Sequence, residues 1–417
     1  MKIKIADLEL KTEKPQFAEN TFNRWNTRFP MTTYSVNYQD VFDIGRVYFY
    51  LMDGDNAICY AQERIEEFLD PNPQLRWIEL QPDLSIGKVK DHHKAGLISI
   101  KLAIHDKSKN GPVDFALFSA WKKPPPKRPM NFKVRAYIYQ CRDLPAADSD
   151  GNSDPYICVW DTGKKIQQTK YIEDNVNPLF YETLELVYEA NKIDELPPFI
   201  FDVYDKDFNP LDEDDFICRA IIPVSEAAVA FEKDEVPRPQ WHKCRMKQGA
   251  PECGEVLVSF SIVSDDFNFK TPVKYMDLMK TVLFDEYNIE ISILGLRDLQ
   301  SVGILPVKKA FIVFNLKSLI PPDCAQAIEN IKTQPGPAGP NPTINTIIKF
   351  TLPLPGDALY CPKLQCSVFD NIFKSFMQPL LGVFTIPIGE ILHQKQSKRQ
   401  EEMENLDHII VELEKIM

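Results

Sequence analysis

Short runs in which apolar and polar residues alternate recur over most of the chain and predict β-strands. In the first part of the chain these runs are irregularly spaced. From about residue 131 to 265 they follow one another at the spacing of a β-sandwich, and a similar series returns from about 286 to 390. The pattern predicts an all-β fold of tandem antiparallel β-sandwiches. The runs lie at 46–52, 57–61, 77–80, 96–104, 132–140, 156–160, 183–188, 199–204, 216–222, 254–263, 288–295, 310–316, 344–352, 363–369 and 382–386.

These runs divide the chain into segments. We expect a small β-unit at 1–120 (the first unit), a complete sandwich at 131–265 (the middle domain) and a further sandwich at 280–390 (the third unit). Two proline-rich stretches interrupt them. The stretch 122–129 is expected to be a stiff spacer between domains, and 334–342 a loop within the third unit.

The last segment, 391–417, has a different period. Its apolar residues fall at helical spacing on one face, with glutamates around it, which predicts an amphipathic helix. Anionic lipid would repel the acidic face, so the helix is expected to pack on its own protein or on a protein partner. The residues of this partner face are Leu406, Ile409, Ile410 and Leu413.

Composition narrows the possible functions. The 417 residues carry a formal net charge of −12, so the chain has no overall basic field of the kind that attracts nucleic acid. The longest apolar runs are far shorter than the ~20 residues that span a bilayer. Nucleic-acid partners and a membrane-spanning helix are therefore not expected. Prolines outnumber glycines 33 to 16, which fits short strands and turns better than long helices.

The cysteines and the N-terminus indicate the compartment. Nine cysteines are scattered singly, and the first ten residues alternate like a strand without a secretory apolar core. We expect reduced thiols and an intracellular protein, cytoplasmic or peripheral to a membrane, in an organelle that the sequence does not identify. Nucleophile-elbow, phosphate-loop, zinc-protease and dinucleotide motifs are missing from the sequence, so an enzyme is not expected.

Carboxylates gather in two loops of the middle domain. Asp148 and Asp154 lie in the first loop, while Asp205, Asp207 and the run 212–215 follow a later apolar strand. Loops of an antiparallel sandwich can meet at one end, where like charges without a counter-ion repel one another. Hard oxygen ligands in flexible loops suit Ca²⁺ better than Mg²⁺ or zinc. The sequence therefore predicts a calcium site.

The order of these motifs resembles a C2 domain. The stretch 144–156, Leu-Pro-Ala-Ala-Asp-Ser-Asp-Gly-Asn-Ser-Asp-Pro-Tyr, is followed by Asn-Pro-Leu-Phe at 177–180 and by Asp-Val-Tyr-Asp-Lys-Asp at 202–207. With Gly-Glu-Val-Leu-Val-Ser-Phe at 254–260, the domain looks like a C2 domain from the C-terminal half of a ferlin. The stretch 289–299 resembles the start of the next ferlin C2 domain. More weakly, the first unit is similar to the region that precedes this pair, as an incomplete C2 domain.

The resemblance implies calcium ligands, one position at a time. Asp148 and Asp154 match the first loop of the family, and Asp205 and Asp207 match the later Asp-x-Asp pair. The fifth ligand stays open between Asp212 and Asp215, because this loop is two residues longer than the family pattern. The alternative is that the acidic loops only keep the sandwich soluble, or remain as a relic that binds no ion.

A bound cation would convert this end of the domain into a membrane-binding surface, since it masks the acidic charge and lipid phosphates can complete its shell. Apolar loop tips could then enter the headgroup region, with ordinary loop packing as the alternative. Three lysines could contact phosphoinositide heads, although a solvated strand face is the favoured reading. The tips are Ala146, Ala147, Phe208 and Leu211, and the lysines are Lys164, Lys165 and Lys170.

The flanking units depart from the calcium pattern. In the third unit, the stretch 300–307 that follows Leu299 contains no acidic residue, and the later loop keeps only Asp370. In the first unit, Asp53 and Asp55 fit a hairpin turn. The leading hypothesis is a ferlin-like peripheral membrane adaptor or scaffold that binds Ca²⁺ and anionic phospholipid through its middle domain. Protein partners would bind the flanking units and the C-terminal helix. Ferlins also carry a membrane anchor and further C2 domains, which are not expected here.

A second hypothesis belongs to another class of protein. The chain could be a calcium-independent structural accessory subunit of a large intracellular assembly, built on a truncated ferlin-like module. The C-terminal helix and the proline-rich loops would then hold it in place. The two hypotheses differ in whether the acidic cluster of the middle domain binds metal.

Overall fold

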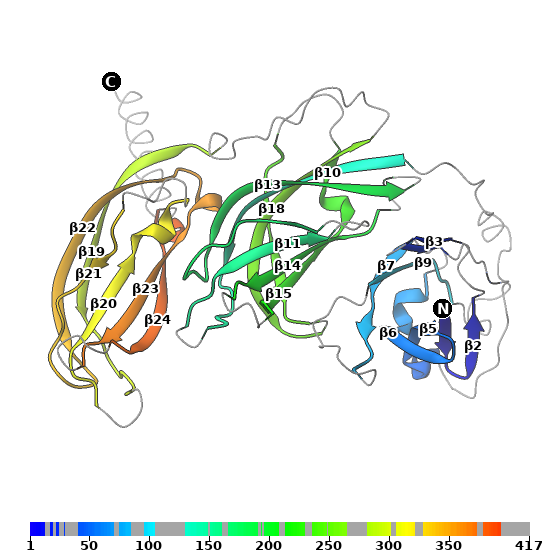
Figure 1. Ribbon diagram of the computed structural model, residues 1–417, viewed down its shortest axis with the longest axis horizontal. Coiled ribbons are helices and arrows are strands. Elements are labelled where there is room, and N and C mark those ends of the chain that lie inside the picture. Colours follow the sequence, from blue (N-terminus) through cyan, green and yellow to red (C-terminus); the bar gives the residue numbers. More distant parts are fainter. Residues whose placement is uncertain are drawn as a thin grey trace, which may run out of the picture.

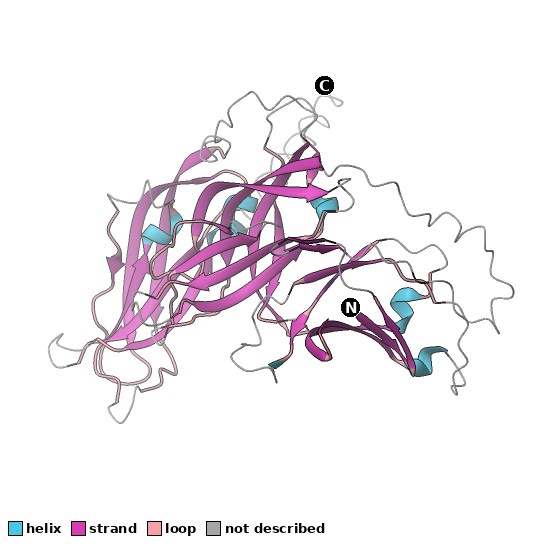
Figure 2. Cartoon of the chain, turned by 45° about the vertical axis from the view of Figure 1, so that its right-hand side comes forward, coloured by secondary structure: helices cyan, strands magenta, loops and turns pink. Residues whose placement is uncertain are grey.

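The computed structural model shows three β-units in sequence order, and strands dominate each of them (Figures 1 and 2). The prediction of an all-β fold is confirmed. The structure describes residues 1–12, 17–19, 22–24, 29, 41–70, 75–84, 96–104, 130–148, 151–160, 166–190, 193, 196–207, 213–229, 236–247, 249–264, 282–301, 306–321, 328–372 and 378–392. The expected helix at 391–417, with Leu406, Ile409, Ile410 and Leu413, lies outside these residues beyond position 392, as does the expected spacer at 122–129.

The first unit contains a five-stranded sheet in the order β2-β1-β5-β6-β8, with β7 paired to β9 and β3 to β4. The hairpin predicted at Asp53 is confirmed, because Asp53 pairs with Asn56 and Gly54 adopts a φ of 59° in the turn. The strands are β1 (Lys2–Ile5), β2 (Leu8–Lys11), β3 (Phe17–Glu19), β4 (Phe22–Arg24), β5 (Arg46–Asp53), β6 (Asn56–Arg64), β7 (Arg76–Glu79), β8 (Gln81–Pro82) and β9 (Leu97–Ile100).

The middle domain follows the strand order β12-β11-β14-β15-β17-β18-β10-β13, with β16 beside β18. Strands β15 and β17 pair only at Arg219 and Arg245, so the sheet opens there into two facing layers. The strands are β10 (Met130–Arg142), β11 (Pro155–Trp160), β12 (Ile166–Gln168), β13 (Leu179–Ala190), β14 (Phe199–Asp205), β15 (Asp215–Ile222), β16 (Ala228–Val229), β17 (Gln240–Arg245) and β18 (Glu252–Ser264).

Alternation along these strands sends one set of side chains between the layers of the middle domain. The ring of Phe260 lies 4.7 Å from that of Phe199 and 5.4 Å from that of Phe201, and all three side chains are buried. Fully burying a side chain of this size contributes about 1.5–3 kcal/mol. This core fixes the strands, and the loops between them carry the candidate site.

The third unit pairs β19 with β22 and places a sheet in the order β21-β20-β23-β24 against them. The proline-rich stretch 334–342 is a loop between β21 and β22, as predicted. The strands are β19 (Phe284–Gly295), β20 (Ala310–Asn315), β21 (Ile331–Lys332), β22 (Thr343–Pro355), β23 (Lys363–Asp370) and β24 (Leu380–Pro387).

Candidate functional site

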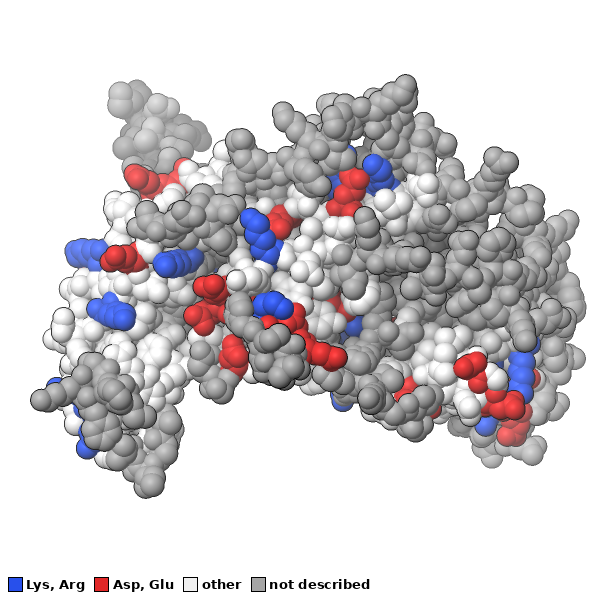
Figure 3. Space-filling view, in the orientation of Figure 1, with Lys and Arg blue, Asp and Glu red and all other residues white. Residues whose placement is uncertain are grey.

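Strand pairing brings the two acidic loops of the middle domain to one end. Pro155, the first residue of β11, lies opposite Asp205 at the end of β14, and Asp205 lies opposite Asp215 at the start of β15. Asp154 therefore stands beside Asp205, although 51 residues separate them. Figure 3 shows acidic side chains on the visible face close to where the middle domain meets the third unit.

Backbone amides hold the two central carboxylates. The amide of Asp154 donates to Oδ1 of Asp205 at 2.5 Å, and the amide of Asp174 donates to Oδ1 of Asp154 at 2.8 Å. The amide of Lys206 donates to the carbonyl oxygen of Asp154 at 3.0 Å, which ties the two loops together a second time. These bonds fix the carboxylates from one side.

The carboxyl group of Asp205 lies in an unfavourable environment for a negative charge. Its side chain is 3% exposed, and burial, followed by the charges of Asp148, Asp154 and Asp207, raises its pKa to about 6. The hydrogen bond from the amide of Asp154 opposes this effect without cancelling it. The charges of the three other predicted ligands thus act on Asp205.

In the acidic run 212–215, the residue that contacts its neighbours is Asp214, which was not one of the two expected fifth ligands. Asp214 accepts hydrogen bonds from the Tyr156 hydroxyl at 2.6 Å, from Lys206 Nζ at 2.8 Å and from the amide of Asp207 at 3.1 Å. Although burial opposes it, the bond from Lys206 and the other two lower the pKa of Asp214. Asp215 is exposed, and Asp212 lies outside the described residues. The choice between Asp212 and Asp215 as fifth ligand therefore stays a prediction.

The donor set is suitable for a hard cation, but its side chains do not converge on one point. Among the residues that the structure describes, no three acidic, histidine or cysteine side chains are grouped closely enough to hold a metal ion. Asp148 is exposed, and Asp154 and Asp207 are partly exposed, so an ion can approach their carboxylates from solvent. Oxygen ligands alone, one of them the buried carboxylate of Asp205, form the kind of donor set that Ca²⁺ takes.

The predicted membrane-contact residues lie partly outside the described chain. Ala146 and Ala147 are exposed beside Asp148, whereas Phe208 and Leu211 fall in an undescribed stretch. Lys170 is exposed, and its backbone amide donates to Glu182 at 2.8 Å. The other two lysines, Lys164 and Lys165, lie outside the described residues.

The acid of the third unit has a structural role. Asp370 is 2% exposed, and its carboxylate accepts hydrogen bonds from the amides of Lys308, at 2.9 and 3.1 Å, and Lys309, at 2.6 Å. These bonds close the loop before β20. With its oxygens occupied by the backbone, Asp370 serves the fold of this unit.

A polar network on β14 and β15 was not predicted from the sequence. Asp202 has no exposed surface, and its carboxylate accepts hydrogen bonds from Trp160 Nε1 at 2.7 Å and from Arg219 Nε at 2.6 Å. Arg219 also reaches Glu79 of the first unit at 3.0 Å. The acidic Asp-Val-Tyr-Asp run contains Asp202, but alternation alone only places this residue on the same face of β14 as Tyr204.

Within the described residues, no helix is long and apolar enough to cross a membrane. The C2 domain profile matches residues 132–244 and 288–405, which together exceed half of the chain.

Comparison with other proteins gives ferlins among the relatives. Human myoferlin (Homo sapiens) is 27% identical over 282 residues, covering 61% of this chain and 12% of myoferlin. Fer-1-like protein 4 of Mus musculus is 25% identical over 213 residues, covering 44% of this chain and 10% of that protein. The chain thus spans about an eighth or less of the length of these relatives. A solved pair of C2 domains from Extended-Synaptotagmin 2, calcium bound, matches at 18% identity and a TM-score of 0.24, covering 62% of this chain and 85% of that one.

Proposed function

Because the chain belongs to the C2-domain family and is similar to ferlins, we propose that its middle domain binds Ca²⁺ and then attaches to an anionic phospholipid membrane. The proposed role is that of a peripheral adaptor or scaffold with no catalytic step. The flanking units would supply contacts to protein partners.

The observation that supports this proposal is the environment of Asp205. A buried carboxylate surrounded by three others is held in place by backbone bonds at the cost of charge repulsion. Nearby positive charge would relieve that repulsion, but the ammonium group of the adjoining residue, Lys206, is bonded to Asp214 instead. The cluster therefore favours an added cation.

In this proposal Asp154 and Asp205, each held by a backbone amide, are the fixed ligands, and Asp148 and Asp207 turn toward them. When bound, Ca²⁺ supplies positive charge that lipid phosphate oxygens can also contact. Ala146 and Ala147 are exposed at the edge of the first loop, beside Asp148. Lys170 adds a positive charge outside the acidic cluster.

The proposal is tested with the full chain in two steps. Isothermal titration with Ca²⁺ measures ion binding, and co-sedimentation with phosphatidylserine vesicles in calcium or in chelator measures membrane binding. Asp205→Asn/Asp207→Asn should abolish both. A control variant, Asp285→Asn/Glu286→Gln, changes net charge equally at exposed positions of the third unit and should retain both.

Three results would overturn the proposal. Absence of calcium binding by the unchanged chain would remove its basis and favour the calcium-independent accessory subunit. Calcium binding without calcium-dependent pelleting would leave an ion site that does not act on membranes. Pelleting that is equal in calcium and chelator, and equal in the double variant, would assign membrane contact to another surface.

A further inference from the structure

The third unit contacts the first acidic loop of the middle domain through one buried side chain. Gln365 on β23 is 2% exposed, and its Nε2 donates to Asn152 Oδ1 at 2.5 Å and to the carbonyl oxygen of Asp174 at 3.2 Å. Its Oε1 accepts from the amide of Val176 at 3.3 Å. Both ends of this amide are thus used to hold the neighbouring domain.

Two further contacts surround this amide. Lys363, at the start of β23, donates to both carboxylate oxygens of Asp143, at 2.8 and 2.6 Å. Gly151 of the acidic loop faces Leu380 and Val383 of β24 so closely that a Cβ there would lie 3.4 and 3.5 Å from them. Gly151 also has a φ of 84°. The loop is therefore packed as well as hydrogen-bonded.

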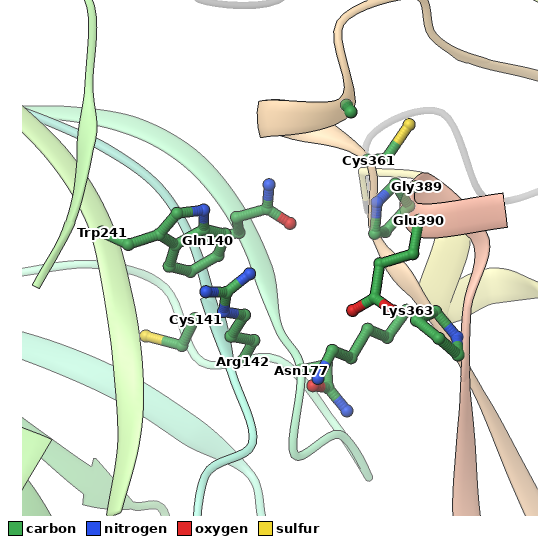
Figure 4. A pocket seen from close by; sticks show the side chains of 12 residues that line it. Gln140, Cys141, Arg142, Asn177, Trp241, Cys361, Lys363, Gly389 and Glu390 are labelled. Atoms are coloured by element: carbon green, nitrogen blue, oxygen red, sulfur yellow. The ribbon is translucent and has the colours of Figure 1, made fainter. Parts of the chain in front are cut away.

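A second part of the same interface lies away from the acidic loop. The rings of Tyr139 and Tyr360 are 5.3 Å apart, and Arg238 pairs with Asp357 at 2.9 Å. Between the domains is a cavity of about 50 Å³, lined on one side by Gln140 and on the other by third-unit residues (Figure 4). A polar cavity of this size can hold several water molecules.

The position of Asn152 connects docking with ion binding. Asn152 lies between the predicted ligands Asp148 and Asp154, and its carbonyl oxygen accepts from the amide of Asp148 at 3.1 Å. The other anchor, Asp174, donates its amide to Asp154 Oδ1. Gln365 therefore holds both backbone segments that position the first-loop carboxylates, while Asp148 itself stays exposed to an incoming ion.

We propose that β23 of the third unit acts as a latch on the calcium loop: Gln365 and Lys363 hold the first acidic loop in its ion-binding shape, so ion binding and third-unit docking strengthen each other. This inference rests on the proposed calcium binding of the middle domain. A loop that is ordered before binding loses less entropy when the ion arrives. By linkage, the ion stabilises the docked third unit to the same extent.

The test compares the unchanged full chain with Gln365→Leu/Lys363→Gln in calcium titrations. The dissociation constant for Ca²⁺ should rise about five- to tenfold in the latch variant, which is within the usual range of coupling between sites. Loss of the Lys363 charge alone would tighten cation binding, so a weakened affinity cannot come from simple electrostatics. Lys349→Gln is the matched control, because Lys349 pairs at 2.6 Å with Glu290 inside the third unit.

A reciprocal measurement and a second variant complete the test. Calcium should slow amide hydrogen exchange in β23 of the unchanged chain and not in the latch variant. Tyr360→Ala, which weakens docking without touching the acidic loop, should also raise the dissociation constant. A rise in the dissociation constant of Tyr360→Ala supports the latch even if Gln365→Leu perturbs the folding of β23.

The outcomes separate the latch from the proposed function. Calcium binding with equal affinity in the unchanged chain and in both variants would overturn the latch and leave the calcium site standing. Tighter binding in the variants would show that the third unit obstructs the loop, which also contradicts the proposal. Failure of the unchanged chain to bind calcium would overturn both.

Discussion

Glu79 of the first unit reaches the buried guanidinium of Arg219 in the middle domain, with Oε1 and Nη1 3.0 Å apart. The same guanidinium donates to Asp202 at 2.6 and 2.9 Å. Burial raises the pKa of Glu79 above its usual value. Although burial opposes it, the hydrogen bonds to Asp202 raise the pKa of Arg219, so the guanidinium stays charged. One arginine thus neutralises acids from two units.

We expect Arg219→Met to destabilise the middle domain strongly. The carboxyl group of Asp202, which has no exposed surface, would lose the cation and the two hydrogen bonds that now hold it. Removing one partner of a buried ion pair usually lowers the free energy of unfolding by about 3–5 kcal/mol. Urea denaturation followed by tryptophan fluorescence measures this loss, since Trp160 also donates to Asp202.

Glu79→Gln provides the comparison for this variant. The amide can still accept a hydrogen bond from Arg219, and Asp202 keeps its partner, so the loss should be about 1 kcal/mol or less. Equal losses in the two variants would mean that the contact between units, and not the buried Asp202, determines the stability of the network.

In chelator, Asp205→Asn should stabilise the middle domain. The asparagine oxygen can still accept from the amide of Asp154, while the buried negative charge and its repulsion by three neighbours disappear. The gain should be on the order of 1 kcal/mol at neutral pH. It is measured as a rise in thermal midpoint relative to the unchanged chain.

In calcium, the unchanged chain should have a higher thermal midpoint than Asp205→Asn. The unchanged chain should gain thermal stability in calcium, whereas Asp205→Asn should gain little, because a ligand that binds only the folded state stabilises it by mass action. Asp285→Asn, at an exposed position of β19, should follow the unchanged chain in both conditions. A lower midpoint of Asp205→Asn in chelator would contradict the strained environment assigned to Asp205.

Much of the fold could be predicted because strand alternation is a local signal. The long strands β10 and β18 and the Asp-Gly hairpin at Asp53 follow from side-chain period and turn chemistry. The C2 domains and the similarity to ferlins were also predicted correctly. The meeting of Asp154 with Asp205 follows from antiparallel order, but their role as calcium ligands stays a prediction.

Contacts between units could not be predicted in this way. Gln365 and Asn152 are 213 residues apart, and Arg219 and Glu79 are 140 apart. Asn152 lies in the motif at 144–156, but the motif does not indicate a partner for it, and Gln365, Arg219 and Glu79 belong to no spaced motif. Each of the four would be equally acceptable as a solvent-exposed polar residue. Their partners depend on how folded units dock, which periodicity within one strand does not encode.

Gly254→Ala should destabilise the middle domain more than Gly249→Ala does. Both glycines have positive φ, 69° and 77°, so the backbone penalty is similar at about 1 kcal/mol. A Cβ at Gly254 would also lie 3.1 Å from the carbonyl oxygen of Asp143 and from Leu144 Cδ2, whereas Gly249 has nothing within 4 Å. Chemical denaturation measures the loss in free energy of unfolding for each variant, and the difference between the two gives the cost of the close contact at Gly254. Equal losses would show that β18 shifts to relieve that contact.

The thiol of Cys253 should be the most reactive of the described cysteines at neutral pH. A hydrogen bond from Cys218, which outweighs partial burial, lowers the pKa of Cys253 to about 7. Burial raises the pKa of Cys59 and Cys361 to about 11. Because the thiolate is the nucleophile, the iodoacetamide labelling rate of Cys253, followed by mass spectrometry, should rise through a midpoint near pH 7.

The hydrogen bond from Cys218 is the largest cause of the lowered pKa of Cys253, ahead of a backbone hydrogen bond at Met246, so the midpoint should move when Cys218 is changed. In Cys218→Ala the donor is lost, and the midpoint of labelling at Cys253 should shift toward the ordinary thiol value of about 8.5. Cys218→Ser retains a donor and should keep the midpoint close to that of the unchanged chain. Cys218 is fully buried, so Cys218→Ala removes packing as well as the bond, whereas Cys218→Ser retains a donor side chain of similar size. A midpoint that is the same in the alanine and serine variants would assign the reactivity to the exposure of Cys253 instead.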